Sequence, residues 1–203
     1  LYVIYYLDAD AGTNMVFLVV ALSYLIGSIP TAYIAGRWLR SKDIRRLGDS
    51  NVGAANAYRE LGALTGVAVG IFDAAKGALA IYIAQRFSLP QVQVLVAGTA
   101  AVMGHNFPAF LGFRGGRGVS TSIGVLVSTV TLPMLILAVP TIITLLITRN
   151  VTKSMVVMFV PLSGLSWWLG FSGLLIGFSI FLPCLVGLTH LLRTKHMPAR
   201  LSP

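Results

Sequence analysis

The chain has 203 residues, of which 56% are hydrophobic and only 10% are charged, and its 15 Lys and Arg against 6 Asp and Glu give a formal net charge of +9. A soluble domain carries about 25% charged residues, so this composition excludes an ordinary water-exposed surface and favours one integral membrane domain. The single cysteine, Cys184, has no partner for an internal disulfide, so no oxidising compartment is implied.

Residues 1–14 precede the first predicted membrane span and read LYVIYYLDADAGTN. They lack the basic region of a signal peptide, so we expect an extracellular N-terminal extension or a remnant of expression. Residues 15–192 are expected to form the membrane domain, and residues 193–203 a basic cytoplasmic tail.

Seven apolar runs predict an all-α integral membrane protein with seven transmembrane helices. The expected spans are 15–39, 61–85, 90–112, 118–131, 132–148, 154–170 and 172–192. The fourth and fifth are shorter than the 20 or so residues that a bilayer core of about 30 Å requires. An alternative merges them into one bent helix with Pro133 and Pro140 as breakers.

The basic residues predict the orientation of the chain. With seven spans, the connections 37–60, 112–118, 149–153 and 193–203 lie on one side and hold nearly all Lys and Arg, whereas the other side has only Arg86. The positive-inside rule then places the N-terminus outside and the C-terminus in the cytoplasm, as expected for a multi-pass protein of the cell (inner) membrane. Merging the two short spans would break this pattern.

The excess positive charge also indicates which partners to expect. Cationic loops beside spans attract anionic headgroups, so membrane lipids are expected partners. The loops lack the interleaved aromatic residues typical of nucleic-acid binding, so no nucleic-acid partner is expected.

The first long cytoplasmic connection contains LGDSNVGAANAYRELG, residues 47–62. Small residues let backbone N–H groups approach a ligand, and successive N–H groups bind anions. The N-terminus of helix 61–85 and the Arg59 guanidinium would add positive charge. We therefore predict a phosphate-binding loop. The alternative is a tightly packed loop in which Asn51 and Asn56 make turn hydrogen bonds.

The second unusual connection is GHNFPAFLGFRGGRGVST, residues 104–121. Three glycines (115, 116 and 118) alternate with Arg114 and Arg117 just before the N-terminus of helix 118–131. Backbone donors, a helix N-terminus and guanidinium groups would converge on one anion-sized space. The sequence contains no GxxxxGK[ST], so this is not a Walker A loop. The alternative is a turn whose arginines only set topology.

Three titratable residues lie within or at the end of predicted spans. His105, at the end of span 90–112, is a candidate for donating to a phosphate or taking a proton, and a buried histidine bonded to a neighbouring loop is the alternative. Asp73 and Lys76 share a helix face and predict a neutralising pair, with a direct substrate role as the alternative. The three histidines are dispersed and neither HExxH nor CxxC occurs, so no metal is expected.

Two anion-binding loops on one membrane face predict two phosphorylated ligands, or one ligand held at both ends. An acyl tail of such a ligand would lie among the helices. The pattern therefore indicates lipid headgroup chemistry. A transporter or a non-catalytic binder of a phosphorylated molecule is the competing hypothesis, but no internal repeat is visible and the loops are not at the midplane.

These loops resemble those of the bacterial acyl-phosphate:glycerol-3-phosphate acyltransferase family, and the resemblance extends over residues 22–193. The matching motifs are Gly27-Ser28-Ile29-Pro30, the segment from Gly48 to Arg59, Asp73 with Lys76 and Gly77, and the segment from Gly104 to Thr121. The resemblance implies seven spans, a cytoplasmic active site and no cofactor. It further implies acyl transfer from acyl phosphate to glycerol-3-phosphate.

Several positions depart from the family pattern, so the chain is identified as a diverged member. Asp49 and Ser50 replace a Ser-Gly pair, Ala55 replaces Thr, and Arg117 replaces Lys. In the tail, the family's histidine and asparagine are absent, and His190 or His196 would stand in for the former. Asp49 should repel a phosphate unless Arg45, Arg46 or Arg117 compensates its charge.

The resemblance implies a set of site residues. Asn51, Asn56 and Arg59, with loop 48–54, would hold glycerol-3-phosphate. The second loop would hold acyl phosphate, and His105 would orient a phosphate or that loop. The implied catalytic residues are His105, Arg117 and Asn51. The implied substrate-binding residues are Ser28, Asp49, Ser50, Gly53, Asn56, Arg59, Arg114, Gly115, Gly116 and Gly118.

The sequence shows no nucleophilic Ser-His-Asp set and no His-x4-Asp pair. A separate strong base is not required, because the leaving phosphate is an anion that can accept the hydroxyl proton. Catalysis is then expected to consist mainly of positioning and charge stabilisation.

Overall fold

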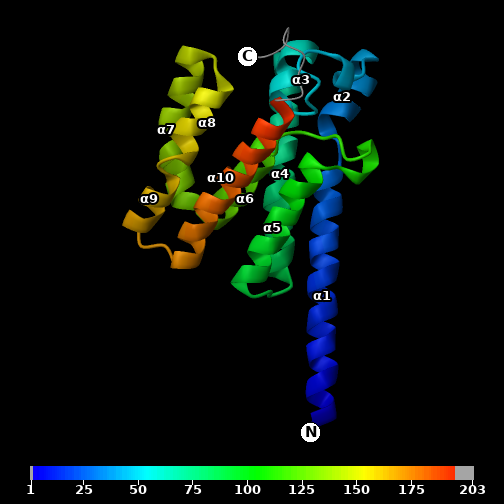
Figure 1. Ribbon diagram of the computed structural model, residues 1–203, viewed down its shortest axis with the longest axis vertical. Helices are drawn as coiled ribbons and strands as arrows, with labels where there is room; N and C mark the ends of the chain where they lie inside the picture. The colour runs from blue at the N-terminus through cyan, green and yellow to red at the C-terminus, as the bar shows by residue number, and fades with distance from the viewer. Residues whose placement is uncertain (1, 195–203) are drawn as a thin grey trace.

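The computed structural model describes residues 2–194, and the side chains of residues 13–193; over that range its regular structure is entirely helical (Figure 1). The α-helices are α1 (Tyr2–Ser28), α2 (Thr31–Arg40), α3 (Ala54–Leu61), α4 (Ala63–Arg86), α5 (Gln91–Asn106), α6 (Val119–Thr129), α7 (Thr131–Thr148), α8 (Val151–Phe159), α9 (Leu162–Trp168) and α10 (Gly173–Thr194). Two short 3₁₀ helices, η1 (Ile44–Arg46) and η2 (Ala109–Leu111), lie in the long connections.

Helices occupy all seven predicted spans, but the spans are not equivalent. Among the described residues, five stretches are long and apolar enough to cross a membrane: Thr13–Arg40, Ala63–Arg86, Gln91–Leu111, Thr131–Thr148 and Gly173–Arg193. With 11 residues, α6 is about 16 Å long, well short of a bilayer core. The expectation of an all-helical membrane protein is therefore confirmed, whereas seven full-length spans are not observed.

Two predicted spans are interrupted. The first bends where Ile29 and Pro30 separate α1 from α2, and α1 begins within the segment that was predicted as an extension. The sixth, 154–170, is divided into α8 and α9 around Pro161, because a proline ring cannot continue the preceding helical hydrogen bonds. The break between α6 and α7 falls at Val130 rather than at Pro133 or Pro140, which both lie in α7.

The two glycine-rich connections lie at the same end of the helix bundle. In Figure 1, α2, α3, the connection from α5 to α6 and the last turn of α10 lie toward the upper end, and the start of α1 lies at the lower end. Both glycine-rich loops therefore share one end of the molecule. The predicted tail begins inside α10, and residues 195–203 lie outside the described residues.

Small residues let the helices cross closely. At four glycines in the α1–α5 and α4–α6 crossings, an added Cβ would come closer than 3.0 Å to a backbone carbonyl of the facing helix. The pairs are Gly27 with Ala101, Gly104 with Tyr24, Gly77 with Thr121, and Gly124 with Ala74. Reciprocal contacts of this kind bring backbones together in membrane bundles, where dispersion rather than the hydrophobic effect drives packing.

The Gly124→Ala variant is expected to lower the thermal unfolding midpoint in detergent. The new methyl would meet the Ala74 carbonyl on α4, and overpacking typically costs about 1–3 kcal/mol. Gly187→Ala is the matched control, since its Cβ would meet nothing within 4 Å and alanine favours the helix. Equal midpoints for the two variants would contradict close packing of α4 against α6.

A small apolar cluster anchors the first glycine-rich loop beneath α2 and α4. Its buried members are Ala32, Ile44, Val52, Ala57, Leu61 and Val69. Within AANAYREL, Ala57 and Leu61 are four residues apart, so they lie on one face of a helix. The segment predicted as a loop thus contains a short helix, α3, which begins after Gly53 and carries Asn56 and Arg59.

Candidate active site

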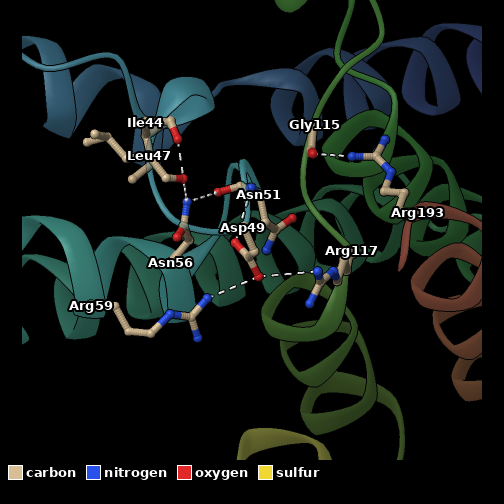
Figure 2. Close-up of polar contacts among 9 residues, drawn as sticks. All are labelled: Ile44, Leu47, Asp49, Asn51, Asn56, Arg59, Gly115, Arg117 and Arg193. Atoms are coloured by element: carbon tan, nitrogen blue, oxygen red, sulfur yellow. Dashed lines mark hydrogen bonds and ion pairs between the residues drawn. The ribbon is translucent and has the colours of Figure 1, made fainter. Parts of the chain in front are cut away.

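Asn56 holds the first loop in shape. Its side chain is fully buried, and its Nδ2 donates to the carbonyl oxygens of Leu47 and Asn51 at 3.0 Å and of Ile44 at 3.4 Å (Figure 2). The predicted alternative, turn hydrogen bonds from an asparagine, therefore holds for Asn56. Direct contact of Asn56 with a ligand remains a prediction.

The Asn56→Ala variant is expected to destabilise the protein by about 1–3 kcal/mol, because buried carbonyl groups lose their hydrogen-bond donor. Thermal unfolding in detergent measures the loss. Faster proteolysis within residues 47–53 should accompany it, since this segment is the one that the amide ties down. An unchanged midpoint and cleavage pattern would contradict this structural role.

Asp49 joins the two glycine-rich loops. Its Oδ2 lies 3.0 Å from Nη2 of Arg59 and 3.2 Å from Nη2 of Arg117, and its Oδ1 accepts the Asn51 backbone N–H at 3.2 Å (Figure 2). The negative charge of Asp49 is therefore compensated by Arg117, which was one of the three predicted candidates, and also by Arg59, which was not. We call the set Arg59, Asp49 and Arg117 the Asp49 bridge.

Of the two other arginines named as candidates, Arg45 is engaged elsewhere. Arg45 pairs with Asp43 at 2.7 Å. Its hydrogen bond holds the pKa of Asp43 at about 2, below the ordinary aspartate value. Asp43 consequently stays ionised at neutral pH, and Arg45 is committed to it rather than to Asp49.

The second loop packs its glycines against His105. Gly115 and Gly116 are buried, and the Gly116 N–H donates to the His105 carbonyl at 3.0 Å. A Cβ on Gly116 would collide with the imidazole Nε2, so any larger residue there would require the His105 side chain to move. Gly118 caps α6 with φ of +83°, a left-handed conformation that favours glycine.

Polar atoms without partners gather at the start of α6. Among the described residues, Nε of Arg117 and the hydroxyl oxygens of Thr121 and Ser122 are buried without a hydrogen-bond partner. The first N–H groups of a helix also lack partners within the helix. Buried polar groups are almost always hydrogen-bonded, so these atoms suit a region that receives a polar ligand or water.

Arg193 connects α10 to the second loop, and sequence reasoning missed this contact. Its guanidinium donates to the carbonyl oxygens of Gly115 and Asn106 and lies over the Phe107 ring, 5.5 Å from the centroid (Figure 2 shows the Gly115 contact). From the sequence, Arg193 was predicted only as one of the basic residues that set the topology and as the start of the tail. The available signal was that the resemblance to the family extends as far as this arginine, over residues 22–193.

A buried charge cluster lies beneath the loops. Lys76 Nζ is 2.6 Å from Asp73 Oδ1 and donates to the Ile29 carbonyl at 2.7 Å, and Thr31 donates to the same Oδ1. His105 Nδ1 is 3.6 Å from that oxygen. The predicted neutralising pair is therefore present, with side-chain exposures of 1% for Asp73 and 8% for Lys76.

Of the other predicted site residues, Ser28 lies beside the second loop, whereas Ser50 and Arg114 face the solvent. Ser28 donates to the Tyr24 carbonyl at 2.8 Å and lines a small pocket of about 10 Å³, enough for about one water, beside His105 and Gly116. Ser50 and Arg114 are exposed, and in the described part of the chain the Arg114 side chain makes no ion pair. The structure does not bring Arg114 to the Asp49 bridge.

The fold and the site together define an all-helical, multi-pass integral membrane protein with two arginines converging at one end of the bundle. The family model described as glycerol-3-phosphate acyltransferase matches residues 17–200. Glycerol-3-phosphate acyltransferase 4 of Dehalococcoides mccartyi is 48% identical over 185 residues, covering 89% of this chain and 98% of the relative. Glycerol-3-phosphate acyltransferase 1 of the same strain is 38% identical, covering 86% of each chain.

A solved structure agrees with these relatives. The crystal structure of PlsY (YgiH), an integral membrane glycerol 3-phosphate acyltransferase, in its glycerol 3-phosphate form, matches with a TM-score of 0.80 and 28% identity over 89% of this chain and 90% of that one. Its lysophosphatidic acid form matches with a TM-score of 0.76. The chain belongs to the glycerol-3-phosphate acyltransferase family.

Proposed function

We propose that this protein transfers an acyl group from acyl phosphate to the sn-1 hydroxyl of glycerol-3-phosphate, yielding lysophosphatidic acid and inorganic phosphate. The observation that carries the proposal is the meeting of Arg59 and Arg117, from separate glycine-rich loops, around a single carboxylate oxygen. This spacing suits one anionic group, since guanidinium groups bind carboxylates and phosphates with the same donors. The names of its relatives support a glycerol-3-phosphate acceptor.

The acceptor would bind at the first loop. Arg59 would hold the phosphate, with Arg117 reaching it from the second loop, and Asn51, Ser50 and Gly53 would present polar and backbone groups beside it. Asn56 would act through the shape of the loop, because its amide nitrogen is already used by three carbonyls.

The donor would bind at the second loop, with its phosphate near the N-terminus of α6. Gly115, Gly116 and Gly118 allow close backbone approach, and Arg117 and the start of α6 favour negative charge. Arg114 would contribute at most long-range attraction from its exposed position. His105, packed on Gly116, would orient this loop, and Ser28 would line the pocket beside it.

In the reaction, the glycerol hydroxyl oxygen forms a bond to the acyl carbonyl carbon. The bond between that carbon and the phosphate oxygen breaks, and the departing phosphate accepts the hydroxyl proton. Arg117 and backbone N–H groups would stabilise the charge that develops on the carbonyl and phosphate oxygens. No cofactor enters this scheme.

For the topology, we propose seven passes, with α6 and the broken α8–α9 segment forming the two incomplete ones. The N-terminus would lie outside and the glycine-rich loops would face the cytoplasm from the cell membrane. The basic residues of the loops at the upper end in Figure 1 support this orientation through the positive-inside rule.

The test is phosphate release by the purified protein given palmitoyl phosphate, with and without glycerol-3-phosphate. We expect release that depends on glycerol-3-phosphate, together with lysophosphatidic acid. Binding of either ligand without turnover would instead favour a binder or transporter.

A further inference from the structure

Asp49 supplies the proposed acceptor site with a negative charge of its own. Its Oδ2 contacts one guanidinium from each loop, at 3.0 and 3.2 Å. A phosphate oxygen would seek these same donors. Because like charges at such separations repel strongly, a ligand phosphate and the Asp49 carboxylate do not fit between the two guanidinium groups together.

We propose that the Asp49 carboxylate takes the place of the acceptor phosphate in the free protein and is displaced when glycerol-3-phosphate binds. The inference rests on the proposed function of the site and adds a specificity-determining residue to it. A neutral polyol offers no charge to replace the carboxylate, so the Asp49 bridge selects ligands that carry a phosphate. Asp49 takes no part in bond making or breaking.

The surroundings of the Asp49 bridge suit such an exchange. Asp49 and Arg117 are shielded, with side-chain exposures of 14% and 17%, whereas Arg59 is 50% exposed. A ligand can therefore reach Arg59 from the solvent. Arg117 also has a buried Nε without a partner among the described residues, so its guanidinium retains a donor for an incoming phosphate.

The residue type at position 49 gives the inference its chemical basis. The resemblance implies a serine there, and a serine hydroxyl would donate to a phosphate rather than compete with it. The Asp49 carboxylate of this chain can only accept hydrogen bonds. It therefore competes with the ligand phosphate for the arginines instead of binding it. Its Oδ1 also accepts the Asn51 N–H, so the residue keeps a local structural bond that a test variant should preserve.

The decisive variant is Asp49→Asn, which keeps the size of the side chain and an oxygen acceptor for Asn51 but removes the charge. We expect the Kd for inorganic phosphate and for glycerol-3-phosphate, measured by calorimetry on the purified protein in detergent, to fall about tenfold. That change corresponds to about 1.4 kcal/mol. KM for glycerol-3-phosphate should fall by a similar factor while kcat stays nearly constant.

The Asp43→Asn variant is the matched control. The Asp43 carboxylate also accepts an N–H two residues on, pairs with an arginine and has a side-chain exposure of 14%, but its partner is Arg45. Its phosphate affinity should equal that of the wild type. A similar gain in both variants would mean that net charge alone sets the affinity, which would overturn the proposal.

Weaker or unchanged phosphate binding by Asp49→Asn would also overturn the proposal, since the carboxylate would then be arranging the arginines rather than competing for them. Asp49→Ser provides a second variant if the asparagine does not fold. If neither variant folds, Asp49 is required for folding, and the proposal that it competes with phosphate is overturned. If the wild type forms no lysophosphatidic acid, the proposed function fails, and the phosphate titrations still decide the role of the Asp49 bridge.

Discussion

Replacing Arg117 with alanine is expected to lower kcat at saturating substrates by at least about tenfold. Arg117 lies between the glycines ahead of α6 and reaches the Asp49 bridge at 3.2 Å, whereas Arg114 is exposed. Loss of one preorganised donor to a developing negative charge typically costs about 2–4 kcal/mol in the transition state. Phosphate release from palmitoyl phosphate in the presence of glycerol-3-phosphate measures the effect.

Two comparisons make the Arg117 result specific. Lys153→Ala removes an exposed positive charge from α8, outside the glycine-rich loops, and should leave kcat unchanged. Arg117→Lys keeps the charge but not the planar fork of donors, so its rate should lie between those of the wild type and the alanine variant. Wild-type turnover by Arg117→Ala would remove this arginine from the mechanism.

The Lys76→Met variant is expected to cause the largest loss of stability, about 3–5 kcal/mol in the free energy of unfolding. It would leave Asp73, 1% exposed, without the ammonium that lies 2.6 Å from its carboxylate. Breaking a buried pair on one side is costly because the remaining charge has no compensation. Thermal unfolding in detergent should show a large fall in the midpoint, together with loss of expression in the membrane fraction.

The double variant Asp73→Asn with Lys76→Met is the control for that prediction. It contains no unpaired buried charge, and the asparagine can still accept from Thr31. We expect it to recover most of the lost stability, since removing both partners of a buried pair is often nearly neutral. A double variant as unstable as Lys76→Met would show that packing of the lysine stem, not charge, is what matters.

The positions of the helices were largely predictable because the bilayer imposes one strong constraint. A long apolar run has to become a helix in lipid to satisfy its own backbone, so each predicted span contains helix. The boundaries were less predictable. Nothing in hydropathy marks Val130 as the end of α6, and the division of α8 from α9 depends on how that segment packs as well as on Pro161.

The sequence predicted the two loops and the residues of the site, but not which of these residues contact one another. Glycines and arginines at close spacing indicated where an anion would bind, and the two loops do meet. Arg193 was missed because its contact with Gly115 joins residues 78 positions apart. Asn56 was predicted to hold the ligand, with turn hydrogen bonds as the alternative; its amide donates to the loop backbone, and contact with a ligand stays a prediction.

By itself, the sequence determined the class of protein, the location of its helices and the one-sided placement of its basic loops, since these follow from composition and spacing along the chain. Only the tertiary structure decided which charges neutralise one another. Asp49 had three candidate partners by position, and in the fold its partners are Arg117 and Arg59. The second loop brings Arg117 to within 3.2 Å of the carboxylate, and α3 places Arg59 at 3.0 Å. Electrostatic partners depend on distance in space, and separation in sequence does not set that distance.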